Sequence, residues 1–227
     1  MKMIVVQHND VEGPGLIKNW AIKHHYDLDI KRPDQGDSLA EIRPDQFDFL
    51  LILGGNQSAN DPLKWLQDER NLIKRTAKAG LPIYGACLGG QEISKAFGGM
   101  VVHSTAKEIG WLPVKNVSGD SNIPDQMTVF HWHGEDFTLP ANAKLLFSTK
   151  VDDKQGFMLG DHIVALQFHL EMTPEEVKKL TDFDADFIKE SDAPNAIQQT
   201  AEEMNAKEIP SDNEKVLDYL LDQITKN

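Results

Sequence analysis

Residues 81–91 of this chain, Leu81-Pro82-Ile83-Tyr84-Gly85-Ala86-Cys87-Leu88-Gly89-Gly90-Gln91, decide its fold. A short apolar run ends at Gly85 and a helical pattern starts near Leu88, which predicts a strand that turns sharply into a helix. Glycines two positions before and two positions after Cys87 let such a turn form, because they place no Cβ atom against the neighbouring strand and helix. A strand followed at once by a helix is the basic unit of an α/β fold.

The segments before this turn repeat the same alternation. Residues 3–7 and 47–53 are apolar nearly throughout, which predicts strands that are buried on both faces of a sheet, and residues 26–30 are a weaker strand candidate. One helix is expected over about residues 63–79, and another directly follows Cys87. We therefore expect an α/β fold with an open, mostly parallel central sheet and helices on both faces.

The middle of the chain, residues 100–168, has a different pattern. It carries short strand-like pieces separated by turn residues, which predicts antiparallel additions to the sheet instead of further parallel units. These pieces are residues 110–117, 128–130, 144–148, 157–159 and 163–168.

The C-terminal part has the start signals of helices. Thr173-Pro174-Glu175-Glu176 combines an N-cap, a proline at the first helical position and a capping-box glutamate. Ser211 to Glu214 are predicted to form a second capping box. Pro194 and Pro210 divide the remainder into two further helices.

This C-terminal part is also acidic. Residues 171–227 contain 15 acidic and 6 basic residues. We expect one domain over residues 1–190, followed by an acidic helical extension over residues 191–227. Its apolar stripes should pack on the domain or on a partner, which leaves a homodimer open.

The composition excludes several classes of protein. The chain has 227 residues and a formal net charge of −13, with no basic stripe to neutralise phosphates, so we expect no nucleic-acid partner. Its longest unbroken apolar run, residues 49–53, is too short to cross a membrane. The single cysteine, Cys87, excludes an internal disulfide, and the first residues predict a strand instead of a signal peptide. We therefore expect a cytoplasmic protein.

Cys87 is the candidate nucleophile. The turn lifts its sulfur above the sheet, and the start of the following helix favours the thiolate, which is the reactive form. The backbone N–H of Leu88 has no partner within the helix, so it can donate to a developing oxyanion. The competing interpretation is that Cys87 is a small buried apolar residue, as many free cysteines are.

A cysteine nucleophile in acyl transfer needs a histidine, usually oriented by a third group. Residues 163–168 form an apolar run that leads into His169-Leu170-Glu171. A spacing of two along an extended chain puts His169 and Glu171 on the same side, so Glu171 can hold one ring nitrogen while the other faces the thiol. The carboxyl edge of a parallel sheet is the usual place for such a site. The alternative is a polar strand end that meets solvent.

His131-Trp132-His133-Gly134-Glu135 is a competing constellation, because a His-x-His sequence beside a carboxylate can bind zinc. A zinc site needs a third ligand at a recognisable spacing, and the sequence shows none. Lining of a substrate pocket or plain packing explains these residues better. We therefore expect no metal and no cofactor.

Together these motifs resemble the class I glutamine amidotransferases of the triad type, and among them the stand-alone GMP-synthase-like proteins. The resemblance spans about residues 3–188 and implies a flavodoxin-like architecture. Leu170 stands where the family usually has proline, and Asn56 stands where proline often follows a glycine pair. The matching blocks, in the family's order, are Leu53-Gly54-Gly55, Gly85-Ala86-Cys87-Leu88-Gly89-Gly90-Gln91, Glu108-Ile109-Gly110-Trp111, His131-Trp132-His133-Gly134 and Gln167-Phe168-His169-Leu170-Glu171.

The resemblance implies a role for each residue that matches a family motif. Cys87 would attack the side-chain amide carbon of glutamine, His169 would act as general base and then acid, and Glu171 would hold His169. The backbone N–H groups of Gly55 and Leu88 would form the oxyanion hole. The remaining matches imply substrate contacts and comprise Gly54, the side chain of Gln91, and the backbone of His131, Trp132 and His133.

Three hypotheses about function follow. The leading one is hydrolysis of the side-chain amide of glutamine, or of a related γ-glutamyl amide, through a cysteine thioester. No phosphate-binding loop pattern is present, so we expect the ammonia to pass to a separate synthetase or acceptor subunit. The second hypothesis is hydrolysis of γ-glutamyl peptides or amines with no ammonia acceptor. The third is a non-catalytic binding module on the same scaffold, with the acidic helices as its interface.

Overall fold

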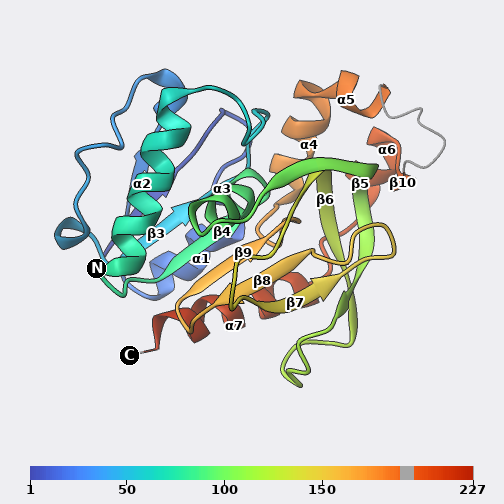
Figure 1. The fold of residues 1–227 in the computed structure, drawn as a ribbon. Helices are drawn as coiled ribbons and strands as arrows, with labels where there is room; N and C mark the ends of the chain where they lie inside the picture. The colour runs from blue at the N-terminus through green and yellow to red at the C-terminus, as the bar shows by residue number, and fades with distance from the viewer. Residues whose placement is uncertain (190–196, 227) are drawn as a thin grey trace.

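The computed structural model describes residues 1–189 and 197–226 (Figure 1). These residues form a ten-stranded mixed sheet in the order β10-β5-β7-β8-β9-β4-β3-β1-β2, with β6 paired to β5. The strands are β1 (Lys2–Val6), β2 (Asp27–Lys31), β3 (Phe49–Ile52), β4 (Ile83–Ala86), β5 (Val101–Asn116), β6 (Gln126–Phe137), β7 (Lys144–Ser148), β8 (Gly156–Leu159), β9 (Ile163–Leu166) and β10 (Ile197–Gln198). The α-helices are α1 (Gly15–Lys23), α2 (Lys64–Lys78), α3 (Leu88–Ala96), α4 (Pro174–Phe183), α5 (Ala185–Lys189), α6 (Ala201–Ala206) and α7 (Ser211–Thr225).

One half of the sheet is parallel and is covered by helices on both faces. Strands β2, β1, β3, β4 and β9 are parallel neighbours in that order. The side chains of β1 alternate between two cores, because successive residues of a strand point to opposite faces. Met3 and Val5 pack on the side of α1 and α7, whereas Ile4 and Val6 pack on the side of α2 and α3. This confirms the predicted α/β architecture with its open, mostly parallel sheet.

The middle of the chain adds antiparallel strands, as predicted, but two of them are much longer than the sequence pattern indicates. β5 and β6 have 16 and 12 residues and form one long hairpin. Polar residues such as Lys107 and Glu135 interrupt the apolar pattern that marks a strand, and the register shifts between His103 and Glu108. The sequence therefore shows only the apolar parts of this hairpin.

The two predicted capping boxes have different outcomes. At the start of α4, Thr173 accepts a hydrogen bond from the backbone of Glu176, whose side chain bonds the Thr173 backbone in return, so the first box is confirmed. The second is wrong. Helix α7 has Pro210 as its N-cap, with no side-chain capping bond, and Ser211 is its first helical residue. The predicted break at Pro194 and the predicted boundary after residue 190 lie outside the described residues.

The sequence pattern does not predict α1 or β10. Gly13-Pro14-Gly15 indicates a turn and hides the start of α1, while β10 has only two residues. Both α1 and α7 pack against the sheet, and Trp20 of α1 donates to Asp222 of α7 at 2.8 Å. Among the described residues, no helix combines the length and the apolar character needed to span a bilayer.

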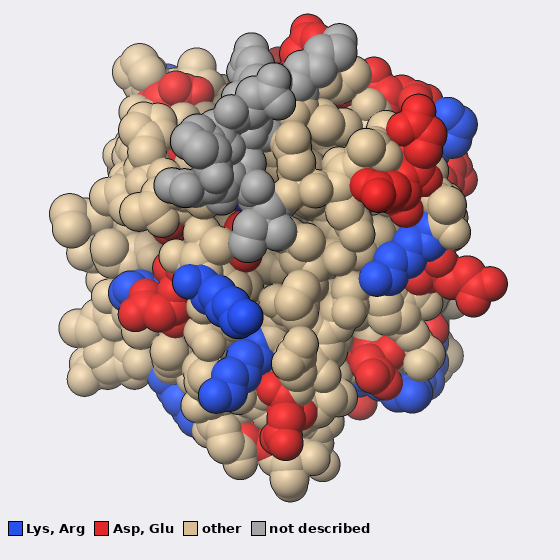
Figure 2. All heavy atoms as spheres, turned by 90° about the vertical axis from the view of Figure 1, so that its right-hand side faces the viewer, with Lys and Arg blue, Asp and Glu red and all other residues tan. Residues whose placement is uncertain are grey.

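The face that carries α5, α6 and β10 shows Lys and Arg side chains close to Asp and Glu side chains (Figure 2). Helix α4 carries two ion pairs whose members are one helical turn apart. On α4, Lys178 lies 2.8 Å from Asp182, and Lys179 lies 2.7 Å from Glu175. Exposed pairs of this kind contribute little to stability, so α4 is held mainly by its apolar face.

Candidate active site

Cys87 occupies the sharp turn between β4 and α3. Its backbone has φ 53° and ψ −113°, a combination that is disfavoured for a residue with a Cβ atom. The predicted need for glycine on both sides is confirmed. A Cβ atom at Gly85 would lie 2.6 Å from the Gly89 carbonyl oxygen, and one at Gly89 would overlap the Ile52 carbonyl oxygen. Helix α3 therefore packs closely on the sheet and holds Cys87 at the carboxyl end of β4.

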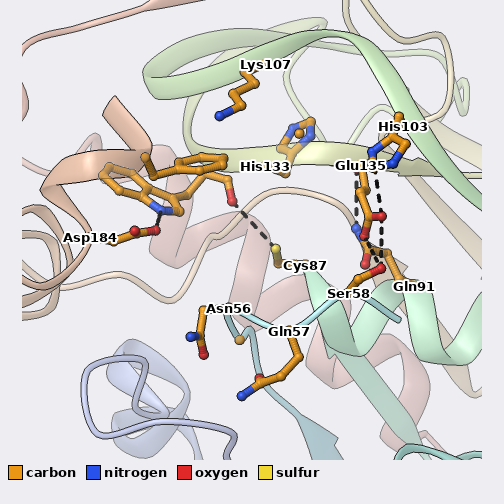
Figure 3. Close-up of a pocket in the computed structure, with 14 residues that line it drawn as sticks. Asn56, Gln57, Ser58, Cys87, Gln91, His103, Lys107, His133, Glu135 and Asp184 are labelled. Atoms are coloured by element: carbon orange, nitrogen blue, oxygen red, sulfur yellow. Dashed lines mark hydrogen bonds and ion pairs between the residues drawn. The ribbon is translucent and has the colours of Figure 1, made fainter. Parts of the chain in front are cut away.

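The thiol of Cys87 faces a cavity of about 450 Å³ (Figure 3). Its sulfur lies 3.8 Å from the carbonyl oxygen of Trp132, to which it donates a weak hydrogen bond. The mixture of polar and apolar groups around it suits a small polar ligand. The other lining residues are Gly55, Asn56, Gln57, Ser58, Gln91, His103, Lys107, His133, Gly134, Glu135, Asp184 and Phe187.

His169 and Glu171 lie just beyond the end of β9. The strand ends at Leu166, two residues before the predicted strand end, and the chain bends there. The residues after Leu166, which no longer pair as part of β9, are held by β6, because the backbone N–H of His169 donates to the Phe130 carbonyl at 2.8 Å. Within it, His169 Nδ1 donates to Glu171 Oε1 at 2.6 Å.

The His169 imidazole interacts with both the thiol and the carboxylate. Burial by itself would lower the pKa of His169, but the charge and hydrogen bond of Glu171, together with the neighbouring Cys87, raise it well above its usual value. Since Nδ1 is bonded to Glu171, Nε2 is the ring nitrogen left for Cys87, and it has no hydrogen-bond partner among the described residues. The structure thus brings together three residues from two distant parts of the sequence.

The two predicted oxyanion donors are also neighbours. A Cβ atom on Gly55 would lie 2.8 Å from Leu88 Cδ2, and Gly55 lines the same cavity as Cys87. Leu88 is the first residue of α3, where a backbone N–H has no partner within the helix. Gln91, on the first turn of α3, also lines the cavity, and its Nε2 donates to the Glu135 carbonyl at 3.3 Å.

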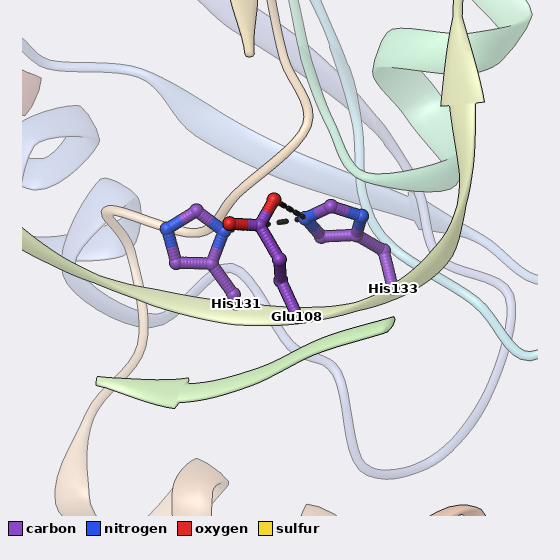
Figure 4. Close-up of side chains that lie close together, drawn as sticks. All are labelled: Glu108, His131 and His133. Carbon is purple, nitrogen blue, oxygen red and sulfur yellow. Dashed lines mark hydrogen bonds and ion pairs between the residues drawn. The ribbon is translucent and has the colours of Figure 1, made fainter. Parts of the chain in front are cut away.

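The predicted substrate-binding segment 131–133 divides into two parts. Trp132 and His133 line the cavity, whereas the side chain of His131 is fully buried and lies near His133 and Glu108 (Figure 4). Burial and the charges of His133 and His169 keep the pKa of His131 well below its usual value, and burial together with His169 lowers that of His133 to about 3. Both imidazoles are therefore neutral at physiological pH.

Two buried polar residues beside the site, His8 and Glu12, were not predicted from the sequence. His8, two residues after the end of β1, donates from Nδ1 to the Gly54 carbonyl at 3.0 Å and from Nε2 to Glu69 at 2.8 Å, so it anchors the glycine loop. Glu12 and His169 both approach Gly54, since a Cβ atom at Gly54 would overlap Glu12 Oε2 and lie 2.9 Å from His169 Cε1. His8 could have been found from the sequence as a polar residue that follows an apolar strand. No local sequence pattern singles out Glu12.

Known proteins resemble this chain in sequence and in fold. The family model described as glutamine amidotransferase class-I matches residues 16–186. A glutamine amidotransferase-like protein of Salmonella typhimurium, YfeJ, is 29% identical, over 99% of this chain and 98% of its own length. The crystal structure of a glutamine amidotransferase from Thermotoga maritima superposes with a TM-score of 0.87 and 26% identity, covering 100% of this chain and 98% of that one.

More distant similarities cover less of the chain. Gamma-glutamyl peptidase 3 of Arabidopsis thaliana is 23% identical, over 68% of this chain and 64% of its own length. GMP synthases from Tropheryma whipplei and Mycobacterium bovis match over 58% and 66% of this chain, which covers only 26% and 29% of their lengths. The chain thus spans about a quarter of these longer enzymes.

Proposed function

The chain belongs to the class-I glutamine amidotransferase family, and on this premise we propose that it hydrolyses the side-chain amide of glutamine or of a related γ-glutamyl compound. The observation that carries the proposal is that the Cys87 thiol faces a cavity and acts electrostatically on the buried His169 ring, which Glu171 holds at 2.6 Å. A thiol, an imidazole and an orienting carboxylate are the set that acyl transfer needs.

The proposed reaction passes through a thioester. Cys87 gives its proton to His169 Nε2 and attacks the amide carbon, and the oxyanion accepts hydrogen bonds from the backbone N–H groups of Gly55 and Leu88. The C–N bond then breaks, the leaving nitrogen takes the proton from His169, and a γ-glutamyl thioester remains. Water gives a proton to His169 and adds to the thioester carbon. The C–S bond breaks, the sulfur regains its proton, and glutamate is released.

The other predicted residues have supporting roles in this proposal. Glu171 stabilises the imidazolium that forms when His169 takes a proton, because its carboxylate is buried beside the ring. The side chain of Gln91 and the backbone of residues 131–133 hold the glutamyl part of the substrate. The reaction takes place in the reducing cytoplasm, where a lone thiol stays reduced.

The fate of the ammonia separates two versions of this function. In the first version, ammonia passes to a separate acceptor subunit, and the similarity to the amidotransferase part of GMP synthases supports this version. In the second, the chain hydrolyses γ-glutamyl peptides or amines and no acceptor exists. The similarity to a γ-glutamyl peptidase supports the second version, and so does a cavity that extends past the thiol to Lys107 and Asp184.

A substrate profile tests the proposal. The purified chain is incubated with glutamine and with several γ-glutamyl amines and dipeptides, and the release of ammonia or amine is measured as kcat/KM. Efficient hydrolysis of free glutamine supports the first version, and a clear preference for γ-glutamyl amines or dipeptides supports the second. No release from any of these compounds would contradict both and favour a non-catalytic binding module.

Replacing the nucleophile is the first prediction. We expect Cys87→Ala to lower kcat by roughly a thousandfold or more, because the thioester can no longer form. Thermal unfolding should show an intact fold, since alanine fills nearly the same space. Unchanged turnover in this variant would contradict the proposed mechanism.

A further inference from the structure

Beside the cavity of Cys87, three buried side chains each place one possible ligand atom close to the other two (Figure 4). His131 and His133 are two residues apart on β6, so they lie on the same face of the hairpin, and Glu108 on β5 is paired directly with His133. The three ligand atoms all lie within 4.8 Å of one another. No third ligand for the two histidines is evident from the sequence pattern, and the pairing of β5 with β6 supplies Glu108.

The distances in this cluster fit a metal ion better than a set of hydrogen bonds. His131 Nδ1 lies 3.2 Å from His133 Nε2, and the latter lies 3.6 Å from Glu108 Oε2. One proton can bridge the two ring nitrogens, but the second distance is too long for a hydrogen bond. A tetrahedral ion with bonds of about 2.0–2.1 Å places its ligand atoms about 3.3–3.4 Å apart.

Two hydrogen-bond donors orient the Glu108 carboxylate, and a further carboxylate lies near the His133 ring. Gln155 Nε2 donates to Glu108 Oε2 at 2.6 Å, and the Thr149 hydroxyl donates to the same oxygen at 3.2 Å. On the opposite side, Asp136 Oδ1 lies 3.7 Å from His133 Nδ1, and neither atom has a hydrogen-bond partner among the described residues. A carboxylate behind a histidine is the usual outer contact of a metal-bound imidazole.

The charges nearby favour a cation. The carboxylates of Asp136 and Asp152 act electrostatically on the buried Glu108 and add negative charge around it. Lys154 is the cation that acts on both aspartates. A bound divalent cation would therefore offset negative charge from Glu108, Asp136 and Asp152.

We propose that Glu108, His131 and His133 form a binding site for a single divalent cation of the zinc type. Two imidazole nitrogens and one carboxylate oxygen are a typical ligand set for zinc, with a fourth position open to water. The site is separate from the Cys87–His169 pair, although His133 also lines the cavity of Cys87.

Competition for Zn²⁺ against a chromophoric chelator tests this site in the full chain, after metal has been removed. We expect wild type to bind one equivalent, and Glu108→Gln and His131→Asn each to weaken binding by at least about tenfold. Two controls should bind as wild type does. Cys87→Ser removes the thiol, which is the main competing ligand, and His162→Ala removes a half-exposed histidine that pairs with Asp161 at 3.0 Å.

A spectroscopic measurement on wild type does not depend on how the variants fold. The zinc X-ray absorption of the loaded protein should show nitrogen and oxygen at about 2.0–2.1 Å and no sulfur at about 2.3 Å. Absence of stoichiometric binding at micromolar Zn²⁺ would overturn the proposal. So would a sulfur ligand, or loss of binding in Cys87→Ser together with wild-type binding in Glu108→Gln.

Discussion

Cys87 adopts a backbone conformation that costs free energy, on the order of 1–3 kcal/mol, and its neighbours hold it there. The glycines on both sides allow the turn, and the Trp132 carbonyl accepts its weak hydrogen bond. His169 interacts with the thiol on one side and with Glu171 on the other. The proposed chemistry therefore depends on a few residues whose positions are fixed by buried contacts.

Removal of the Glu171 charge is a prediction at this scale. Glu171→Gln keeps a hydrogen-bond acceptor for His169 Nδ1 but loses the charge that raises the pKa of this histidine. We expect kcat/KM to fall by roughly 10² to 10⁴-fold. The part of the pH–rate profile that reports His169 should move to lower pH, because its imidazolium is then less stable.

The matched control for this prediction is Glu175→Gln, which removes an exposed carboxylate of α4. This variant should leave both kcat/KM and the position of the pH–rate profile unchanged. A profile that keeps its wild-type position in Glu171→Gln would show that the charge of Glu171 does not act on the reacting histidine.

The contact between α3 and the sheet is what fixes the turn that carries Cys87. The helix begins one residue after the cysteine, and its glycines allow its backbone to approach β3 and β9. A Cβ atom at Gly89 would overlap the Ile52 carbonyl, and one at Gly90 would overlap that of Leu166. Because these neighbours are backbone atoms in paired strands, they cannot move aside as a flexible side chain can.

Gly89→Ala is therefore expected to lower the free energy of unfolding by about 2 kcal/mol or more. Urea-induced unfolding measures this change. In the control Gly134→Ala, the added Cβ atom meets only the flexible Lys107 side chain, at 3.2 Å, so the free energy should change little. Equal effects of the two substitutions would contradict the proposed role of the α3 contact.

At the scale of the whole molecule, one folding unit joins both ends of the chain. Strand β1 and helix α7 share a core, in which Val5 and Leu217 are fully buried. On the other face of the sheet, the His8–Glu69 pair links the end of β1 to α2 and is also fully buried. A change in the protonation of this pair should therefore affect the stability of the whole protein.

The His8 pair predicts how stability depends on pH. Burial would lower the pKa of His8, but the charge and hydrogen bond of Glu69 raise it to about 9. Because this value lies above the usual 6.5, the contribution is fully present below about pH 6.5 and is lost as pH rises through 9. The contribution of protonated His8 to the free energy of unfolding is about 3 kcal/mol. Urea unfolding from pH 6 to pH 10 measures it.

His169 changes stability in the same direction, since its pKa is also raised, so the comparison with His8→Gln isolates the part due to His8. We expect this variant to be less stable at pH 6 and to lose less stability on going to pH 10. An identical pH dependence in both proteins would contradict the protonated state of His8.

Features that depend on residues close together in the chain can be predicted from the sequence alone. The glycines around Cys87, the apolar runs of the parallel strands and the cap at Thr173 each have a local signal, and they were enough to predict the α/β fold and the candidate nucleophile. Only the tertiary structure decided which distant groups meet. It placed Glu12 beside His169 and Glu108 beside His131, because strand order and register set those contacts and no local pattern records them.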